Sequence, residues 1–479
     1  MTKRLYQCLR AVILDGSLGA DTRLPPSRDL ARELGIARNT VVAVYGQLQA
    51  EGYTHSQQGS GTFVLQTTPE ALLFSGVRAG RLRSAAPRHG LSARGLEILA
   101  DPRASARQWG AFMPGVPDVT QLPLHKFARL YSNLWRDPAP ELLSYAYGGG
   151  LPELREVLAQ HLAIARSIDC APEQILITEG AHQAIDLVTR LLGQAGDAAW
   201  VENPGYWGTR TVLTANGIRA VPVPVDEGGM QIAAVPKEEL PPRFIFVTPS
   251  HQYPLGSVMP LSRRVQLLAS ARAWGSWVIE DDYDSEFRFS GRPIAALKGL
   301  EPDAPVIYVG TFSKTLYPGL RVGYLVLPTA LVEPFQAAHA ELYREGHLMT
   351  QAVLASFIGQ GHYASHIRRM RVLYGRRRAM LAHLIERRLG PEWVHATGSE
   401  AGLHLVMNFP EPISDVKVTA EALSRGILVK PLSGYYAADT APRAGLMLGY
   451  ACVPEEQMTA CFERLRASIR AVRAPRGRR

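Results

Sequence analysis

The chain has 479 residues, of which 46% are apolar and 20% are charged, so it is long enough to form at least two domains. No apolar run reaches the length of a membrane-spanning helix, and the N-terminus lacks a signal-peptide cleavage site. The four cysteines are widely spaced without a CxxC pair, so neither a disulfide framework nor a zinc site is indicated. We expect a multi-domain cytoplasmic protein with no metal and no membrane partner.

The net charge of +9 is concentrated towards the two ends of the chain. Residues 1–110 contain 14 Lys or Arg against eight Asp or Glu, and residues 464–479 contain seven Arg and no acid. Basic ends on a mildly acidic body favour contact with nucleic-acid phosphates. For the Arg-rich C-terminus, a solvated tail that aids solubility is an equal alternative.

The N-terminal region predicts three short helices followed by a β-hairpin. Leu5, Leu9 and Ile13 recur at helical spacing, and Ser27 is placed to cap a second helix in RDLARELG. A third helix, in IARNTVVAVYGQLQAEG, follows a tight turn, and YTHSQQGSGTFV alternates around a Gly-Ser-Gly tip. This order is typical of a helix-turn-helix with a wing.

The rest of the chain predicts a linker and then an α/β domain. Residues 67–108 lack a sustained period and are rich in Ala, Gly, Arg, Pro and Ser, although the apolar LEIL segment is compatible with a short helix. Beyond residue 109, helical stretches alternate with the apolar runs QILIT, AAWVE, RFIFVTPS, WVIEDD, VIYVGTFS and VGYLVL. This alternation predicts a parallel or mixed sheet covered on both faces, with ligands at the strands' C-terminal ends.

Three polar segments follow predicted strands. In TFSKTLYPGLRVGY, Lys314 lies near the hydroxyls of Thr311 and Ser313, and Arg321 follows seven residues later. Such a lysine can form a Schiff base with an aldehyde while its neighbours bind a phosphate, although most single loop lysines are simply solvated.

Two further segments strengthen this interpretation. In WVIEDDYDSEF, an apolar strand ends in acidic residues and Tyr283. A buried carboxylate can pair with a protonated pyridine nitrogen, and a tyrosine hydroxyl can bind the oxygen on such a ring. The acidic residues alone would suggest a metal site. ILITEGAHQAIDLV places the amides of Gly180, Ala181 and His182 at a helix start, where a phosphate binds.

The motifs of the second region resemble those of fold-type-I pyridoxal 5'-phosphate (PLP) aminotransferases, and the whole chain resembles one subfamily of transcription regulators. LPPSRDLARELGIARNTVVAVYGQLQAEG, QGSGTFV, ENPGY, TPSHQYPLG, EDDYDSEF and TFSKTLYPGLRVGY, in this order, are similar to the MocR/GabR subfamily of GntR-type transcription regulators. The resemblance implies an N-terminal winged helix-turn-helix over residues 1–66 and a PLP domain of aminotransferase fold type I over 109–479. The latter would comprise a large part with a mostly parallel sheet (140–360), a small C-terminal α+β part (361–473) and a basic tail (474–479).

The resemblance also implies roles for individual residues. Lys314 would form the internal aldimine, Asp281 would face the pyridine nitrogen with Asp282 as the alternative, and Tyr283 would bind the ring oxygen. The remaining cofactor residues would hold the phosphate or stack on the ring, namely Thr311, Ser313, Arg321, Gly180, Ala181, His182 and Tyr206. Tyr145, with Tyr147 as a competitor, would reach the phosphate of the partner subunit, and core packing is the alternative for these tyrosines.

The DNA-binding residues implied by the same resemblance lie at helix starts and at the wing tip. They are Arg28, Arg38, Asn39, Thr40, Gln58, Gly59 and Ser60. Arg can fork onto guanine and Asn can bridge adenine, whereas Thr40 suits a phosphate and the wing tip suits the minor groove. Any one of them alone is equally compatible with a surface cap.

The ligand-binding positions depart from the enzymes of this fold. Met447 stands where amino-acid aminotransferases carry the arginine that binds the substrate carboxylate, and Gly208 stands where GABA-responsive relatives carry a second arginine. Arg443 and Arg210 are near in sequence but do not match either motif. We therefore expect a homodimeric regulator that binds operator DNA and senses PLP or a small amine through Lys314. A functional aminotransferase with an appended DNA-binding domain is the alternative.

Overall fold

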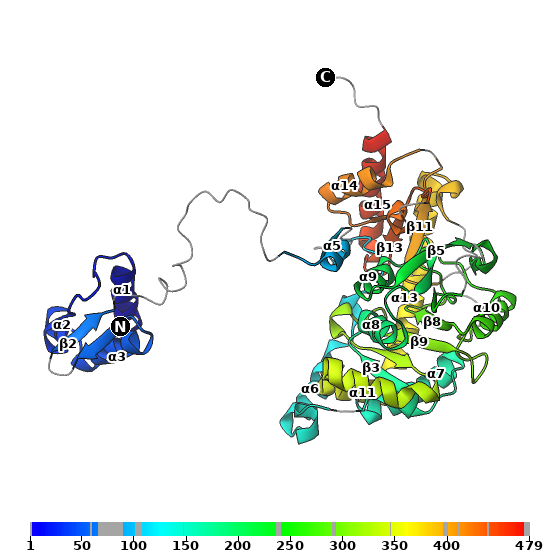
Figure 1. Ribbon diagram of the computed structural model, residues 1–479. Coiled ribbons are helices and arrows are strands. Elements are labelled where there is room, and N and C mark those ends of the chain that lie inside the picture. The colour runs from blue at the N-terminus through cyan, green and yellow to red at the C-terminus, as the bar shows by residue number, and fades with distance from the viewer. Residues whose placement is uncertain are drawn as a thin grey trace. The chain divides into compact units, whose positions relative to one another are not determined.

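The computed structural model describes the chain as two compact units, Met1–Gly90 and Leu91–Arg479 (Figure 1). The described residues are 2–57, 60–65, 90–100, 108–146, 148–235, 241–289, 294–344, 346–395, 401–410, 412–437 and 440–473. Most of the expected linker, residues 67–89 and 101–107, and the basic tail 474–479 lie outside them.

The N-terminal unit consists of three helices and a two-stranded antiparallel sheet, as predicted. Its elements are α1 (Thr2–Leu14), α2 (Ser27–Glu33), α3 (Arg38–Ala50), β1 (Thr54–Gln57) and β2 (Gly61–Val64). The predicted apolar face of α3 is buried, with Val41, Val44 and Leu48 fully covered. The predicted helix-turn-helix and wing are therefore both present.

One local prediction in this unit is wrong. Ser27 does not cap α2, because the N-cap position is Pro26 and no side chain accepts a hydrogen bond there. Ser27 is instead the first helical residue, and its Oγ accepts a hydrogen bond from Arg38 Nε at 3.5 Å. Pro26 has an extended backbone (ψ 137°) and occupies the N-cap position. The helix therefore begins at Ser27, one residue earlier than predicted.

The second unit contains a mixed, mostly parallel sheet of eight strands. The spatial order is β3-β10-β9-β8-β7-β4-β5-β6, in which β10 is antiparallel to both neighbours and β6 is antiparallel to β5. The strands are β3 (Ile175–Thr178), β4 (Ala198–Asn203), β5 (Arg219–Asp226), β6 (Gly229–Met230), β7 (Phe244–Val247), β8 (Trp277–Asp282), β9 (Val306–Thr311) and β10 (Gly323–Val326).

Helices cover both faces of this sheet, because alternate side chains of its strands enter different hydrophobic clusters. On one face Ile307 and Leu325 pack with helices that Figure 1 shows in front of the sheet. On the other face Tyr308 and Tyr324 pack with another helical layer. The helices are α5 (Ala93–Leu99), α6 (Leu124–Arg136), α7 (Pro152–Arg166), α8 (Ala181–Leu192), α9 (Trp207–Ala215), α10 (Leu261–Trp274), α11 (Val332–Tyr343), α12 (Leu348–Gly359) and α13 (His362–Arg388).

A smaller antiparallel sheet follows the long helix α13. Its strand order is β11-β13-β12, and two helices accompany it. Its elements are β11 (His404–Asn408), α14 (Asp415–Ser424), β12 (Lys430–Pro431), β13 (Gly445–Gly449) and α15 (Glu455–Arg473). The observed architecture is therefore the expected one, with a large mixed sheet and a small C-terminal α+β part.

The sequence pattern did not reveal β5. Its prolines, Pro222 and Pro224, lack the backbone N–H that a central strand needs. The structure accommodates them because β6 pairs only with Val225 and Asp226, which leaves most of that side of β5 without a neighbouring strand. Helix α5, which contains the LEIL segment, packs against α9.

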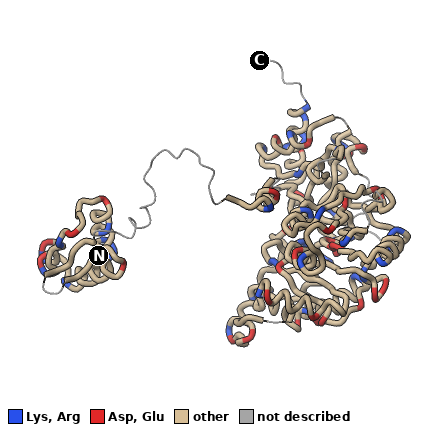
Figure 2. The backbone as a smooth tube through the Cα atoms, viewed as in Figure 1, with Lys and Arg blue, Asp and Glu red and all other residues tan. Residues whose placement is uncertain are grey.

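Charged residues are spread over both units (Figure 2), and basic residues gather at the end of α15, where Arg470 and Arg473 occupy the last turn. Among the described residues, none of the helices is both long and apolar enough to cross a bilayer.

Candidate functional site

A cavity lies at the C-terminal ends of the central strands β8 and β9. It encloses about 820 Å³ of space not filled by protein atoms, part of which is open to solvent. It is lined by Pro114, Gly115, Ala181, His182, Tyr206, Tyr253, Asp281, Tyr283, Thr311, Ser313, Lys314, Pro318 and Arg321. Nine of the residues named from sequence therefore meet in one place.

Lys314 extends into this cavity from the loop that follows β9. Its Nζ donates a hydrogen bond to the carbonyl of Gly115 at 2.9 Å. Burial lowers the pKa of Lys314, and the charges of Asp284 and Asp281 act in the opposite direction. Since a neutral amine is the nucleophilic form of lysine, this burial favours reaction with an aldehyde.

The two neighbouring aspartates of β8 point to opposite sides of the sheet. Asp282 is ion-paired with Arg166 at 2.6 Å and accepts a hydrogen bond from the Tyr308 hydroxyl at 2.6 Å. Asp281 lines the cavity, and its buried Oδ1 has no hydrogen-bond partner. Burial, and next the charge of Asp282, raise the pKa of Asp281 to about 7. The cavity therefore contains a carboxylate that lacks a partner.

The opposite end of the cavity combines a helix N-terminus with an arginine. Gly180 is the N-cap of α8 and adopts a positive φ of 99°. A Cβ atom there would lie 3.3 Å from the guanidinium of Arg321, so glycine permits the close approach of Arg321. The backbone of Arg321 also adopts a left-handed conformation (φ 52°), and its guanidinium donates a hydrogen bond to the carbonyl of Glu179. The first amides of a helix beside an arginine can bind an anion.

Four aromatic or imidazole side chains, His182, Tyr206, Tyr253 and Tyr283, line the cavity walls. The hydroxyl of Tyr206 lies 2.7 Å from His182 Nε2, and the ring of Tyr206 meets that of Tyr253 edge to face, with centroids 5.7 Å apart. Burial, and then the charge of Arg321, lower the pKa of His182. The Tyr283 hydroxyl contacts His251 Nδ1 at 2.9 Å. Flat apolar walls with hydroxyl groups suit a planar aromatic ligand.

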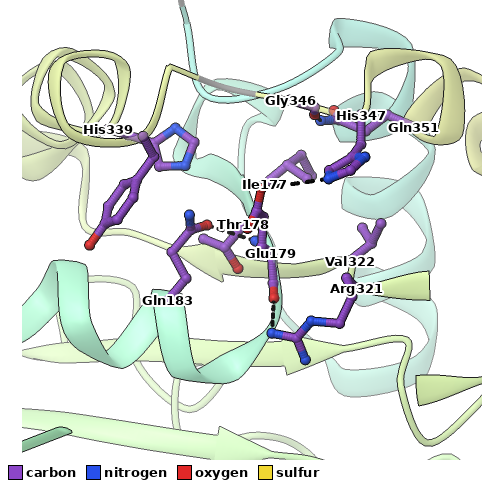
Figure 3. Close-up of a pocket in the computed structure, with 11 residues that line it drawn as sticks. Ile177, Thr178, Glu179, Gln183, Arg321, Val322, His339, Gly346, His347 and Gln351 are labelled. Carbon is purple, nitrogen blue, oxygen red and sulfur yellow. Dashed lines mark hydrogen bonds and ion pairs between the residues drawn. The ribbon is translucent and has the colours of Figure 1, made fainter. Parts of the chain in front are cut away.

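A second, smaller pocket is also lined by Arg321, together with Glu179 (Figure 3). There Arg321 turns toward the backbone of Glu179, while His347 from the start of α12 approaches its carboxylate at 3.6 Å. Glu179 thus contacts Arg321 through its backbone carbonyl and His347 through its carboxylate.

Sequence reasoning missed four of the lining residues. Tyr253 lies within TPSHQYPLG, a motif that supported the resemblance without a role for this residue. Pro318 likewise lies within TFSKTLYPGLRVGY without an assigned role, whereas nothing in the sequence shows that Pro114 and Gly115 fold back onto Lys314. Tyr145 is absent from the cavity and 81% exposed, and Tyr147 lies outside the described residues.

The positions that carry carboxylate-binding arginines in related enzymes have a different environment here. Met447 is fully buried in an apolar cluster with Val406 and Leu432. A side chain at Gly208 would collide with Tyr206 and with His182, at 2.5 and 2.6 Å from a Cβ atom.

The two arginines near these positions lie elsewhere. Arg210 donates to the carbonyl of Tyr435 at 3.2 Å, and Arg443 is exposed. Neither arginine is among the residues that line the cavity.

In the N-terminal unit, the predicted DNA-binding residues lie at the starts of α2 and α3. Arg28, Arg38 and Asn39 are exposed, and Thr40 is partly exposed. Ser60 lies in the turn between β1 and β2, whereas Gln58 and Gly59 fall outside the described residues. The exposed helix starts are free to enter a DNA groove.

Known proteins match both units. Residues 1–64 match the family described as bacterial regulatory proteins, gntR family, and residues 131–465 match aminotransferase class I and II. The probable rhizopine catabolism regulatory protein MocR of Rhizobium meliloti is 39% identical over 100% of this chain and 98% of its own length. The chain belongs to the MocR-type transcription regulators.

Other relatives agree with this assignment. The pyridoxine biosynthesis transcriptional regulator PdxR of Corynebacterium glutamicum is 32% identical, covering 95% of this chain and 93% of its own length. Kynurenine aminotransferase of Pyrococcus horikoshii, solved in complex with PMP, is 26% identical with a TM-score of 0.71, covering 80% of this chain and 98% of its own. This MocR-type protein thus combines a DNA-binding winged helix with an aminotransferase domain of fold type I.

The unpaired carboxylate of Asp281 makes a stability prediction for the ligand-free protein. Its pKa of about 7 lies above the ordinary 3.8, so its contribution to stability is present below about pH 4 and is lost as the pH rises through 7. Asp281→Asn removes this loss. The variant should be more stable than the wild type at pH 8, by about 1–3 kcal/mol, with little difference at pH 4.5. Urea denaturation at the two pH values measures this.

Asp282→Asn provides the matched contrast. Removing its charge leaves Arg166 buried without an anionic partner, so this neighbouring substitution should destabilise the protein at pH 8 by about 3–5 kcal/mol. If Asp281→Asn destabilised the ligand-free protein to the same extent, the assignment of Asp281 as unpaired would be wrong.

Proposed function

We propose that this regulator binds PLP covalently at Lys314 and that occupancy of this site controls its binding to operator DNA. The observation that carries the proposal is the unpartnered Oδ1 of Asp281 in the same cavity as the buried amine of Lys314. A buried carboxylate without a partner is costly unless a ligand supplies one, and a protonated pyridine nitrogen is such a partner.

The residues of the cavity fit the separate groups of PLP. Asp281 would pair with the ring nitrogen, rather than Asp282, whose carboxylate is already held by Arg166 and Tyr308. Tyr283 would donate to the ring oxygen, and Tyr206 would stack on the ring. The phosphate would be held by Gly180, Ala181, His182, Thr311, Ser313 and Arg321.

PLP supplies an aldehyde that forms an imine with an amine, and in this site the resident amine is Lys314. The surrounding protein sets how readily that lysine reacts. Burial keeps a larger fraction of Lys314 neutral, and the Gly115 carbonyl orients its Nζ. Lys314 would exchange its contact with Gly115 for a contact with the bound cofactor, and this change would shift the equilibrium between two protein conformations.

The effector is PLP itself or a small amine. Apolar burial of Met447 and the close contacts around Gly208 leave no arginine where simple amino acids or GABA dock their carboxylates. The names of two relatives, which mention rhizopine catabolism and pyridoxine biosynthesis, are compatible with an amine and with vitamin B6.

The proposed active form is a cytoplasmic homodimer on a repeated or palindromic operator. A twofold assembly matches two half-sites with two winged helices. The strongly exposed ring of Tyr145, 81% accessible, would then contact the phosphate site of the partner subunit. Arg28, Arg38, Asn39, Thr40, Gln58, Gly59 and Ser60 would face the DNA.

Lys314→Ala should abolish covalent retention of PLP. We expect the purified wild-type protein to keep a visible absorbance band through dialysis and the variant to lose it, because no other described lysine lines the cavity. Lys417→Ala, at an exposed position on α14, serves as the control and should keep the band. Persistence of the band in Lys314→Ala would overturn the assignment.

Arg38→Ala should weaken binding to a promoter fragment recovered with the purified protein. We expect a loss of about 1–3 kcal/mol together with relaxed sequence preference, if Arg38 forks onto a base edge. Arg32→Ala, exposed on α2 and paired with Asp29, should cause a smaller loss that is independent of sequence. A uniform loss in Arg38→Ala over all sequences would assign Arg38 to phosphate contact instead.

Transaminase activity is the alternative function, because the cavity contains Lys314, Asp281 and Arg321, to which the motif resemblance assigns the roles of an aminotransferase. We expect no sustained turnover with amino acids and keto acids, since Met447 replaces the carboxylate-binding arginine. A steady-state assay decides this. Turnover at ordinary enzyme rates, about 1–10³ s⁻¹, would favour the enzyme.

A further inference from the structure

A chain of three hydrogen-bonded side chains lies behind the cavity. His251 Nδ1 is 2.9 Å and 3.2 Å from the two carboxylate oxygens of Asp284, and the Tyr283 hydroxyl oxygen is 2.9 Å from the same Nδ1. Asp284 and His251 are 1% and 5% exposed, and only Tyr283 lines the cavity. The pair is therefore hydrogen-bonded to the cavity wall through Tyr283, while the charge of Asp284 also acts on Lys314.

The carboxylate decides which atoms donate in this chain. An ionised carboxylate only accepts hydrogen bonds, so Nδ1 of His251 must carry the proton that binds Asp284. The same N–H is then shared with the Tyr283 oxygen, which acts as an acceptor. Since Tyr283 accepts from His251, its own hydroxyl proton remains available to an acceptor in the cavity.

Neighbouring elements hold this pair in place. The rings of His251 and Tyr283 stack with centroids 5.9 Å apart, and His404 of β11 packs 5.6 Å from His251. The backbone of Gly402 (φ 80°) packs against the pair of His251 and Asp284. A Cβ atom there would lie 2.2 Å from His251 Cε1 and 2.7 Å from Asp284 Oδ2, so only glycine fits this position.

The charged and titratable groups that face His251 come from several elements. Asp284 and Tyr283 follow β8, and His404 comes from the small sheet. Arg378 of α13 and His395 line the adjoining pocket with His251. The arrangement thus connects the small C-terminal part to the cavity wall.

We propose that His251, held by Asp284, is a positioning residue that keeps Tyr283 as a hydrogen-bond donor to the ring oxygen of PLP. This inference rests on the proposed function and extends it beyond the groups that touch the ligand. A hydrogen bond donated to that oxygen weakens its hold on the neighbouring imine proton. Loss of the His251 contact should therefore raise the pH at which the visible band of the bound cofactor changes.

The test is a pH titration of the visible absorbance of the PLP-loaded full-length protein. His251→Leu should raise the midpoint by about one pH unit, as expected for one weakened hydrogen bond to a charged group. His251→Asn, whose amide can occupy the place of Nδ1–H, should restore a midpoint near that of the wild type. In a Tyr283→Phe background, His251→Leu should add no further shift.

Circular dichroism and PLP retention serve as controls that show whether each variant is folded. If His251→Leu does not fold, His251→Gln replaces it, because its longer amide falls near Nε2 rather than Nδ1. An unchanged midpoint in the loss variant, or an equal shift in the Tyr283→Phe background, would overturn the inference. Failure of the proposed function itself looks different, since the wild-type protein would then show no Lys314-dependent band to titrate.

Discussion

The site depends on one buried carboxylate that the protein itself leaves unsatisfied. Asp281 sits at the end of β8 with Oδ1 buried and without a partner, whereas Asp282, one residue on, is fully engaged by Arg166 and Tyr308. The alternation of a β-strand explains the difference, because successive side chains face opposite sides of the sheet. The cavity thus contains Asp281, whose pKa is raised, and Lys314, whose pKa is lowered. This combination favours a ligand with a basic ring nitrogen and an aldehyde.

The regulatory role follows from what surrounds that pair. One end of the cavity has the groups that the proposed cofactor needs, namely the N-terminus of α8, Arg321 and the hydroxyls after β9. The substrate-binding end differs, because Met447 is packed in an apolar cluster and Gly208 has no space for a side chain. A domain that bound the proposed cofactor without a carboxylate clamp would be suited to sensing, and its fusion to a winged helix would couple the sensed state to DNA binding.

Much of this arrangement could be predicted from the sequence, for identifiable reasons. Asp281 lies at the end of a short apolar strand, and Lys314 and Gly180 follow two others; the ends of such parallel strands meet at one edge of a sheet. The face of α3 could be predicted because Val41, Val44 and Leu48 share one side of a helix. The contact of Gly115 with Lys314, the chain of Asp284 and His251, and the proline-rich β5 could not, since they depend on tertiary packing that no local pattern encodes.

The central claim is that PLP at Lys314 changes the affinity of the winged helices for DNA. Its most direct test is to measure the Kd of the full-length protein for one promoter fragment, first stripped of PLP and then reloaded, at constant salt. A coupling of ordinary size predicts that the two Kd values differ by about 5–150-fold, and that Lys314→Ala loses this difference. Equal Kd values for the stripped and reloaded wild-type protein would contradict the account.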